Sequence, residues 1–461
     1  MKISFHGADQ DVTGSCHLLE CDGKKILIDC GMFQGGRELE EENAEPFGFE
    51  PSEIDFVILT HAHLDHCGRL PLLVKRGFKG EIITTAATRE LAKLVMVDAA
   101  HLQEEEALRR TKHKKMNVKK DDTSPLYLLL DAFRTIDYFG RVAHYLVPIN
   151  LTKNIQVTLY DAGHILGSAS IYLIVNDSGQ RKTILFSGDI GNQGRPLLNT
   201  PQTPPQADIV VTETTYGDRR HRPFEDSIVE LYDAINRTLK EGGNVIIPTF
   251  ALERAQEILF FLNKGIKQLA LPPSIQVFLD SPMAISATEI FQRYPDFFKS
   301  SITQLFDTNN DPFQLPGLHF CRETADSMAI NRIHSGAIIM AGSGMCTGGR
   351  VRHHLEHLLA RSECAVIFVG YASQGTLARR IIDGASTVRI FNQEINVRAH
   401  IYTINGFSAH ADRDELIAWH NRIDNVARTF LVHGDFEVMH AFKQNIKGVV
   451  DMPEKGQSFV L

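Results

Sequence analysis

The stretch LTHAHLDHCG, residues 59–68, places three histidines and an aspartate within six positions, and it continues the apolar run FVIL. His61 and His63 are two apart in an extended segment, so both project to the same side. Asp65 and His66 follow at a turn that we expect to begin a helix, where a carboxylate is favoured. A single histidine on an apolar face is usually a packed residue, but four ligand-type side chains at one strand end indicate a metal site, with zinc as the best match.

The length and composition limit the class of protein. A chain of 461 residues predicts two or more domains, and 43% hydrophobic with 23% charged residues is typical of soluble globular proteins. No apolar run reaches the roughly eighteen residues of a membrane helix, and the first residues are too polar for a signal peptide. A net charge of −8 argues against a protein coated in nucleic acid, but it allows a local basic groove.

The cysteines indicate a reducing compartment. There are seven, an odd number, scattered without a CxxC pair. Free thiols in the cytoplasm explain this pattern better than a disulfide framework does.

The pattern of predicted secondary structure changes near residues 201–208, where the sequence PQTPPQAD indicates a linker. Before it, short strands such as KKILIDCG and KTILFSGD end near polar residues, and a charge-rich helical stretch interrupts them. That stretch contains the basic run RRTKHKKMNVKK, residues 109–120, which is either a solvated helix end or a rim that attracts phosphate.

After the linker, uniformly apolar strands alternate with helices, as where NVIIP leads to ERAQEILFFL. This pattern predicts a parallel, doubly wound sheet that binds ligands beyond the carboxyl ends of its strands. From about Glu394 we expect the strand pattern of the first part to return, in INVRAHIYTI and then TFLVHGD.

Four more ligand-type residues end other predicted strands: Asp29, His164, Asp189 and His433. An aspartate before a glycine is by itself most often a turn residue. Strands of one sheet nevertheless bring distant residues to a common edge, so the set can supply five histidines and two carboxylates. Such a set can hold two metals about 3.5–4 Å apart, which activate a shared water and clamp a phosphoryl oxygen.

With these motifs, nearly the whole chain resembles the β-CASP nucleases of the metallo-β-lactamase superfamily. The superfamily motifs match at Asp29, at His61, His63, Asp65 and His66, at His164 and at Asp189, and the β-CASP motifs A, B and C match at Glu213, His410 and His433. Where the family usually has glutamate after the motif C glycine, this chain has Asp435, which is a conservative change.

The resemblance implies a fold and a metal centre. One zinc is held by His61, His63 and His164, the other by Asp65, His66 and His433, with Asp189 bridging both, a hydroxide as the nucleophile, and Asp29 orienting the ligands. The implied fold is an αββα sandwich of residues 1–207 and 393–461, with a doubly wound β-CASP domain inserted at residues 208–392.

The resemblance also assigns the remaining catalytic residues, beside Asp65 and Asp189. A histidine suits protonation of the leaving oxygen, so His410 is the candidate general acid, oriented and kept charged by Glu213. Read without the family, His410 is as readily a structural residue.

Glycine and serine residues before helices predict a phosphate cradle in the inserted domain. The SGMCTGGR loop resembles the phosphate-contacting loop of the family, and Phe250 and Tyr371 are candidates for stacking on bases. The alternative is a set of tight turns without a ligand. The predicted substrate-binding residues are Phe250, Arg254, Ser281, Pro282, Ser343, Gly344, Met345, Gly349, Tyr371 and Thr376.

Other histidines carry no such signal. His353, His354 and His357 fall on one predicted helix, which we expect to be a solvated face rather than a metal site. His400 is expected to be a strand residue beside the site and not a ligand.

The function predicted from these motifs is a zinc-dependent endoribonuclease that acts on single-stranded RNA in a cleft between the two domains. The preference for RNA rests on His433, because DNA-processing relatives tend to lack a histidine at motif C. Two alternatives stay open: a hydrolase of a small lactam, lactone, ester or thioester, and a non-catalytic scaffold of an RNA-processing complex. The sequence leaves undecided the natural RNA, the cleavage motif, any 5′-exonuclease activity and the existence of a homodimer.

Overall fold

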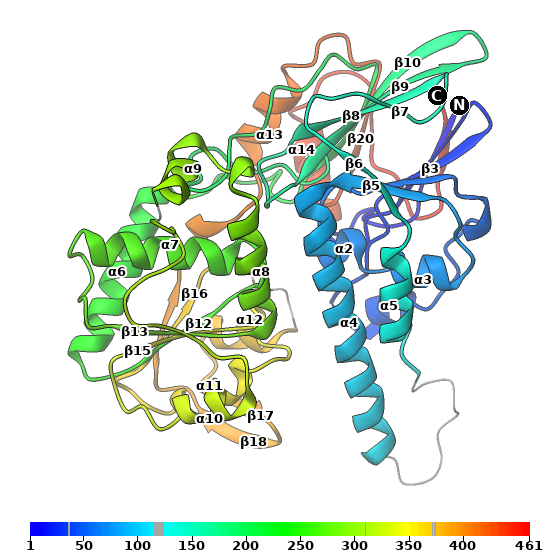
Figure 1. The fold of residues 1–461 in the computed structure, drawn as a ribbon. Coiled ribbons are helices and arrows are strands. Elements are labelled where there is room, and N and C mark those ends of the chain that lie inside the picture. The colour runs from blue at the N-terminus through cyan, green and yellow to red at the C-terminus, as the bar shows by residue number, and fades with distance from the viewer. Residues whose placement is uncertain (36, 114–123, 309, 371, 373–374) are drawn as a thin grey trace. The chain divides into compact units, whose positions relative to one another are not determined.

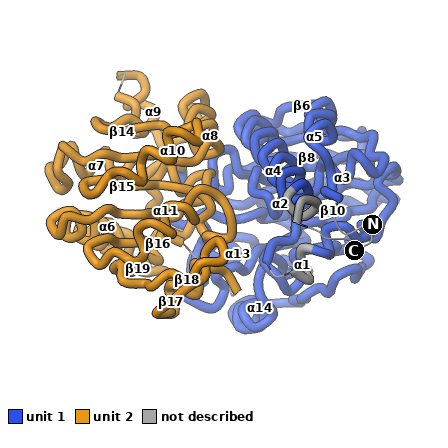
Figure 2. Tube along the Cα trace, turned by 90° about the horizontal axis from the view of Figure 1, so that it is seen from below, with its two compact units in different colours: residues 1–193, 199–220, 410–461 blue, residues 194–198, 221–409 orange. Residues whose placement is uncertain are grey.

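The computed structural model describes the chain except for residues 36, 114–123, 309, 371 and 373–374. The described chain divides into two compact units, drawn in different colours in Figure 2. Unit 1 comprises residues 1–193, 199–220 and 410–461, and unit 2 comprises residues 194–198 and 221–409.

Unit 1 is built on two seven-stranded sheets (Figure 1). The first runs in the order β22 (Ser458–Val460), β1 (Lys2–Phe5), β2 (His17–Cys21), β3 (Lys24–Ile28), β4 (Phe56–Ile58), β5 (Glu81–Thr85) and β6 (Phe139–Ala143). The second runs in the order β21 (Val450–Asp451), β20 (Arg428–Val432), β11 (Ile209–Glu213), β10 (Gln180–Phe186), β9 (Ala169–Asp177), β8 (Ile155–Asp161) and β7 (Ile149–Asn150).

The two sheets of unit 1 pack face to face through alternating apolar residues. Ile3 and Phe5 of β1 share a buried core with Ile171 and Leu173 of β9, as the two-residue period of a strand requires. The opposite face of the second sheet is covered by helices, since Leu185 packs with residues of α13 and α14.

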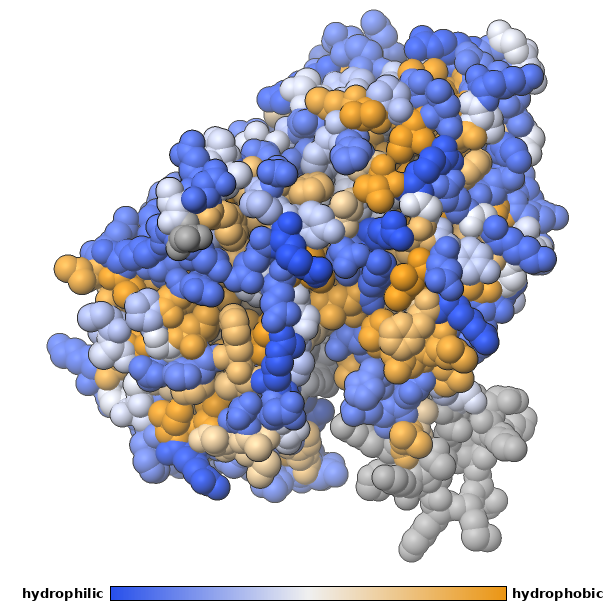
Figure 3. Space-filling model, in the orientation of Figure 1, coloured by the Kyte–Doolittle hydropathy of each residue, from blue (hydrophilic) through white to orange (hydrophobic). Residues whose placement is uncertain are grey.

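Helices also cover the first sheet, where α4 contacts β5 and β6, so the predicted αββα sandwich is confirmed. On the face drawn in Figure 3, apolar atoms gather over α5, where Leu130 and Phe133 are exposed. The α-helices of unit 1 are α1 (Arg37–Glu42), α2 (Leu64–Cys67), α3 (Leu70–Lys75), α4 (Ala86–His113), α5 (Leu129–Ile136), α13 (Arg413–His420) and α14 (Phe436–Lys443), with a 3₁₀ turn at Pro51–Glu53.

Unit 2 has a six-stranded, all-parallel sheet with a separate core on each face. Val245 and Ile247 of β12 face one core, and Ile246 between them faces the other, which confirms the predicted doubly wound architecture. The strand order is β14 (Leu318–Phe320), β13 (Gln276–Asp280), β15 (Ala337–Ala341), β12 (Val245–Pro248), β16 (Ala365–Phe368) and β19 (His400–Thr403), beside a hairpin of β17 (Thr387–Ile390) and β18 (Gln393–Asn396).

Helices cover both faces of this sheet. Leu259 of α7 and Ile285 of α8 belong to one core, while Ile330 of α10 and Leu355 of α11 belong to the other. The helices of unit 2 are α6 (Phe224–Lys240), α7 (Arg254–Lys267), α8 (Pro282–Arg293), α9 (Ser300–Asp307), α10 (Thr324–Ile330), α11 (Val351–Leu358) and α12 (Leu377–Ile382), with 3₁₀ turns at Pro295–Phe297 and Asn405–Phe407.

The strand pattern that was expected to return at Glu394 divides differently in the structure. The INVRAHIYTI segment supplies β18 and β19, and β19 pairs in parallel with β16 in the sheet of unit 2. Only the next strand, β20, joins the sandwich of unit 1, beside β11. Both segments read as strands in the sequence, and their pairing in the structure places them in different sheets. The units accordingly change at residues 221 and 410, whereas the sequence placed these changes near 208 and 393.

Two further expectations concern membrane-spanning helices and the basic run. Among the described residues, no helix is both long and apolar enough to span a bilayer. The greater part of the basic run at residues 109–120 lies outside the described residues.

Candidate active site

The histidine-rich stretch forms a tight turn between β4 and α2. His63 is the N-cap of α2, and Asp65 and His66 lie in its first turn, as the helix-start pattern predicted. Backbone bonds from Ser15 N to the Asp65 carbonyl (2.9 Å) and from Met32 N to the Leu64 carbonyl (3.0 Å) fix the turn against neighbouring segments of unit 1. The ligand-type side chains are therefore presented by a rigid backbone at the end of a buried strand.

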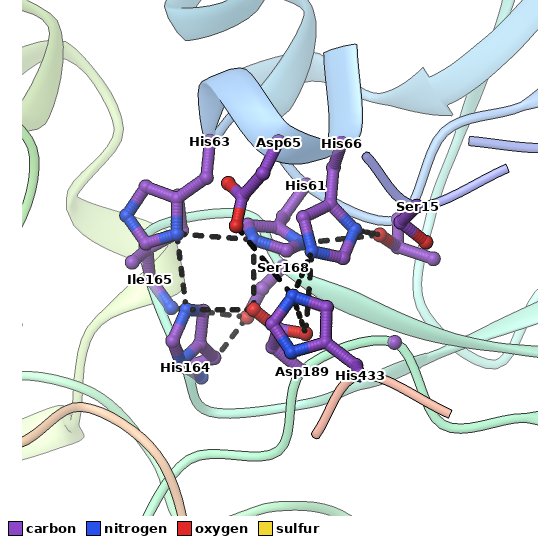
Figure 4. Close-up of polar contacts among 12 residues, drawn as sticks. Ser15, His61, His63, Asp65, His66, His164, Ile165, Ser168, Asp189 and His433 are labelled. Carbon is purple, nitrogen blue, oxygen red and sulfur yellow. Dashed lines mark hydrogen bonds and ion pairs between the residues drawn. The ribbon is translucent and has the colours of Figure 1, made fainter. Parts of the chain in front are cut away.

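A first group of ligand atoms comes from three histidines and one aspartate. His61 Nε2 lies 3.1 Å from His63 Nδ1, which lies 3.2 Å from His164 Nε2. Asp189 Oδ2 lies 3.3 Å from His61 Nε2 and 3.5 Å from His164 Nε2. Figure 4 shows these side chains converging from different segments of unit 1.

A second group shares the same aspartate. The other oxygen of that carboxylate, Asp189 Oδ1, lies 3.3 Å from His66 Nε2 and 3.8 Å from His433 Nε2. His433 Nε2 in turn lies 3.5 Å from Asp65 Oδ2 (Figure 4). One carboxylate thus faces both groups with one oxygen each, which is the arrangement of a bridging ligand. The structure brings together all seven predicted metal ligands in two sets that meet at Asp189.

The chemistry of these donors fits two divalent metals. Asp189 Oδ1 is buried and accepts no hydrogen bond from the described residues. Burial lowers the pKa of His61 to about 4 and that of His63 to about 3, so both imidazoles are neutral at pH 7, the form that binds metal. Burial opposes charge on His433 too, but Asp189 and Asp65 outweigh it and raise the pKa of His433 to about 9. Metal binding would therefore displace a proton from the second group.

Hydrogen bonds to the other ring nitrogens orient the ligands. His66 Nδ1 lies 2.7 Å from Asp29 Oδ2, which leaves His66 Nε2 for a metal. Asp29 also accepts from the backbone N and the hydroxyl of Thr60, both at 2.8 Å, and the same hydroxyl lies 3.0 Å from His61 Nδ1. Asp29 and Thr60 thus fix the rings of one histidine in each group, as residues around metal sites commonly do.

His410 and Glu213 form a pair next to the ligands. His410 Nδ1 lies 3.2 Å from both carboxylate oxygens of Glu213 and 4.0 Å from Asp189 Oδ2. The Glu213 carboxylate is held by the backbone N of Ile190 (2.6 Å) and by the Thr215 hydroxyl (2.6 Å). Burial opposes the charge on His410, but Glu213 outweighs it, and the pKa of His410 is raised above its usual 6.5.

In unit 2, the predicted substrate-binding residues lie at the carboxyl ends of the parallel strands. The loop of residues 342–350 joins β15 to α11 and carries Ser343, Gly344, Met345 and Gly349. Ser281 caps α8 by accepting from Ala284 N, and Thr376 caps α12 by accepting from Arg379 N. Such strand ends are where doubly wound sheets bind ligands.

A small hollow of unit 2 is lined by residues that follow three of these strands. Phe250, Arg254 and Gly344 line it together with Phe368 and other residues. Phe250 is 39% exposed, which leaves its ring accessible, whereas Arg254 is buried and ion-paired with Glu257. Tyr371 lies outside the described residues.

The histidines set aside in the sequence behave differently from one another. His353 and His357 are exposed on α11, as expected, but His354 is fully buried, and its Nε2 lies 2.6 Å from Asp280 Oδ2. The expectation of a solvated helix face was wrong for His354, because that position faces the core between α11 and the sheet. His400 begins β19 and lies 3.2 Å from Glu241, apart from the ligand groups.

Two residues of the site were missed in the sequence. Thr60 directly precedes His61, and Thr215 follows Glu213 by two positions, so their closeness to the motifs was the available signal. The Thr215 hydroxyl lies 2.6 Å from Glu213 Oε2 and 3.1 Å from His433 Nδ1, and it therefore joins the Glu213–His410 pair to a predicted metal ligand.

Three family models match the chain. The metallo-beta-lactamase superfamily model matches residues 10–233, the Beta-Casp domain model matches residues 255–381, and a model described as a Zn-dependent metallo-hydrolase RNA specificity domain matches residues 394–455. Together they cover both the sandwich and the inserted unit.

Curated relatives match along nearly the whole chain. Ribonuclease TTHA0252 of Thermus thermophilus is 39% identical over 96% of this chain and 95% of its own length. An RNase J-like protein of Methanocaldococcus jannaschii is 30% identical over 98% and 96%. Transcription termination factor FttA of the same organism is 30% identical over 94% of this chain and 67% of its own length.

The fold also occurs in a solved structure of distant sequence. A protein of unknown function from Enterococcus faecalis V583 matches with a TM-score of 0.57 and 13% identity, over 100% of this chain and 99% of that one. At this identity the match speaks for the fold alone. The family models and the ribonuclease relatives agree with the grouping of ligand-type residues. The chain therefore belongs to the β-CASP ribonuclease family of metal-dependent hydrolases in the metallo-β-lactamase superfamily.

Proposed function

We propose that this protein is a zinc-dependent endoribonuclease with two zinc ions per chain. The observation that carries the proposal is the position of Asp189, whose two oxygens face two separate sets of buried ligand atoms. Imidazole nitrogens and carboxylate oxygens in these proportions suit zinc better than magnesium or calcium, which favour oxygen ligands.

The residues of each set have distinct tasks. His61, His63 and His164 would hold one ion, Asp65, His66 and His433 would hold the other, and Asp189 offers one carboxylate oxygen to each set. When bound, the two ions supply an activated water and neutralise charge on the scissile phosphate. Asp29, Thr60 and Thr215 contact the Nδ1 atoms of His66, His61 and His433, so each of these three imidazoles presents its Nε2 to the metal.

The leaving oxygen requires a proton, and His410 is the residue that supplies it. Its Nδ1 is engaged by Glu213, which holds the ring in place and favours the protonated form. A general acid positioned in this way contributes about 10²–10⁴-fold in rate.

RNA is the proposed substrate, in single-stranded form. The family model for RNA specificity over residues 394–455 and the relatives named as ribonucleases support RNA. The accessible ring of Phe250 beside Gly344 suits stacking on an unpaired base. The seven cysteines are buried and unpaired, which suits the cytoplasm.

The test is a cleavage panel with matched variants. Purified protein is incubated with end-labelled single-stranded RNA, duplex RNA, DNA of the same sequence, and a set of lactams and lactones. We expect internal cuts in single-stranded RNA, lost in His433→Gln and retained in His420→Gln. His420 is an equally buried histidine of unit 1, bonded to Thr429 and outside the ligand groups.

The panel also separates the alternatives. Turnover of a lactone or lactam without RNA cleavage identifies a small-molecule hydrolase. A protein that binds RNA and zinc but cleaves nothing is a scaffold. Release of mononucleotides from the 5′ end without internal cuts contradicts the endonuclease assignment.

A further inference from the structure

A buried carboxylate in unit 2 collects three hydrogen-bond donors from different segments. Asp280, at the end of β13, is fully buried. Its Oδ2 lies 2.6 Å from His354 Nε2 and accepts from Ser327 Oγ at 2.6 Å. Its Oδ1 accepts from the Arg350 guanidinium at 2.7 Å.

Arg350 is the centre of this arrangement because it binds three acceptors at once. Besides Asp280, its guanidinium donates to the backbone carbonyls of Cys321 (2.8 Å) and Arg322 (2.7 Å). His354 lies one turn further along α11, and its Nδ1 is 3.2 Å from Asn331 Oδ1. The cluster therefore joins the end of β13, the segment after β14, the α10 region and the start of α11.

Arg350 is also the last residue of the loop that carries the predicted phosphate contacts. The loop is closed on itself, since Val351 N donates to the Gly342 carbonyl (3.1 Å) and Ser343 N to the Gly348 carbonyl (3.3 Å). At Gly349 there is no free space, because a Cβ would lie 2.3 Å from the Gly342 carbonyl oxygen. A shift of Arg350 must therefore move the backbone of Ser343 and Gly349 as well.

The cluster is not arranged as a nucleophile and base. Ser327 and His354 both approach the same oxygen of Asp280, Oδ2, rather than one another. All three side chains are buried. A buried ionic cluster contributes little net stability compared with apolar residues of similar size, so its value lies in specifying one geometry.

We propose that Arg350, Asp280 and His354 are positioning residues that set the conformation of the loop at residues 342–350 for contact with a phosphate of RNA. The inference rests on the proposed function, with this loop as a contact for an RNA phosphate. The side chains act through the loop backbone and do not touch the substrate. Lysine at position 350 keeps the charge but offers one nitrogen in place of a planar fork, so it cannot reproduce all three bonds.

The experiment compares Arg350→Met and Arg350→Lys with the control Arg322→Met in the full-length protein. Arg322 is a neighbouring arginine whose side chain binds Glu289 and Ser286 at the surface. Three quantities are measured: hydrogen exchange of the peptide covering residues 342–350, zinc content, and kcat and KM on a short single-stranded RNA. Ser327→Ala is a milder variant in case Arg350→Met does not fold.

In Arg350→Met we expect faster hydrogen exchange in the loop, an unchanged zinc content and a KM within about threefold of the wild-type value. We expect kcat to be about 10²-fold lower, because a displacement of a substrate-contacting group by about 1 Å can cost that much in rate. Arg350→Lys should fall between wild type and Arg350→Met, and Arg322→Met should match wild type. Loop exchange and kcat at wild-type levels in both Arg350 variants would overturn the proposal. If the wild type does not cleave RNA, the proposed function fails, and loop exchange alone decides the positioning role.

Discussion

The Thr215 hydroxyl lies between Glu213 and His433, 2.6 Å from the carboxylate of one and 3.1 Å from Nδ1 of the other. A hydroxyl has one hydrogen, which goes to the carboxylate, and its oxygen then accepts from the imidazole. A single small side chain thereby couples the orientation of the proposed acid pair to that of a metal ligand.

Replacing this hydroxyl should weaken zinc binding. In Thr215→Val, His433 loses the partner of its Nδ1, and loss of such a contact typically costs about 10–100-fold in metal affinity. The affinity is measured by competition with a chromogenic chelator. Thr212→Val is the control, since Thr212 is the more buried of the two threonines and its hydroxyl donates to the backbone carbonyl of Glu213. Equal affinities in the two variants would show that Thr215 does not orient His433.

Removing the proposed acid should separate catalysis from metal binding. His410→Gln is expected to lower RNA cleavage by about 10²–10⁴-fold while both zinc ions remain, because His410 is not one of the seven proposed ligands in the two sets. Glu213→Gln should also lower the rate of RNA cleavage, because the charge that favours protonated His410 is removed. Cleavage rates and zinc content are measured on the same preparations. A parallel loss of zinc and activity would identify His410 as a ligand or a structural residue.

A methyl group at Gly344 should disturb the predicted phosphate loop. A Cβ there would lie 2.7 Å from the Phe250 ring, so either the loop or the ring must move. We expect Gly344→Ala to slow RNA cleavage more than it weakens RNA binding. Gly348→Ala in the same loop is the control, because a Cβ at that position meets open space. Identical cleavage rates and cut positions in both variants would leave Gly344 as an ordinary turn residue.

One buried histidine away from the ligands should make stability depend on pH. Burial, followed by the charge of Arg69, lowers the pKa of His6 to about 4 in the folded protein, against 6.5 in the unfolded chain. Between these values the unfolded chain binds the extra proton, so stability falls as the pH drops from 6.5 towards 4, by up to about 1.4 kcal/mol per pH unit.

Urea unfolding of metal-free protein between pH 7.5 and pH 4.5 measures this slope. His6→Asn should reduce the loss of stability on acidification relative to wild type. His101→Asn, at an exposed histidine on α4, should leave the slope unchanged. If His6→Asn retains the full wild-type slope, His6 does not titrate as described.

The sequence was most informative where chemistry and strand ends coincide. The clustering of imidazoles and carboxylates in the sandwich could be predicted because such residues at strand ends are poorly explained by packing. The partner of each strand could not be predicted, since β19 and β20 are consecutive strands of the chain and only three-dimensional pairing assigns them to different units. His354 was misjudged for a similar reason: helix periodicity alone does not tell which face of α11 meets the sheet.

The cluster around Arg350 could not be predicted for a different reason. Asp280, Ser327 and His354 are common residue types whose contacts depend on distances between segments far apart in the chain. Arg350 and Asp280 are separated by 70 positions, and nothing in local spacing links them. Such contacts become visible only in the folded unit.

Zinc titration of fully chelated wild-type protein, followed by calorimetry and by RNA cleavage in the same samples, tests the central claim most directly. The account predicts two zinc ions bound per chain, no cleavage without metal, and recovery of cleavage only as the second equivalent binds. Full cleavage by exhaustively chelated protein, or saturation at one zinc with full activity, would contradict a two-metal site bridged by Asp189.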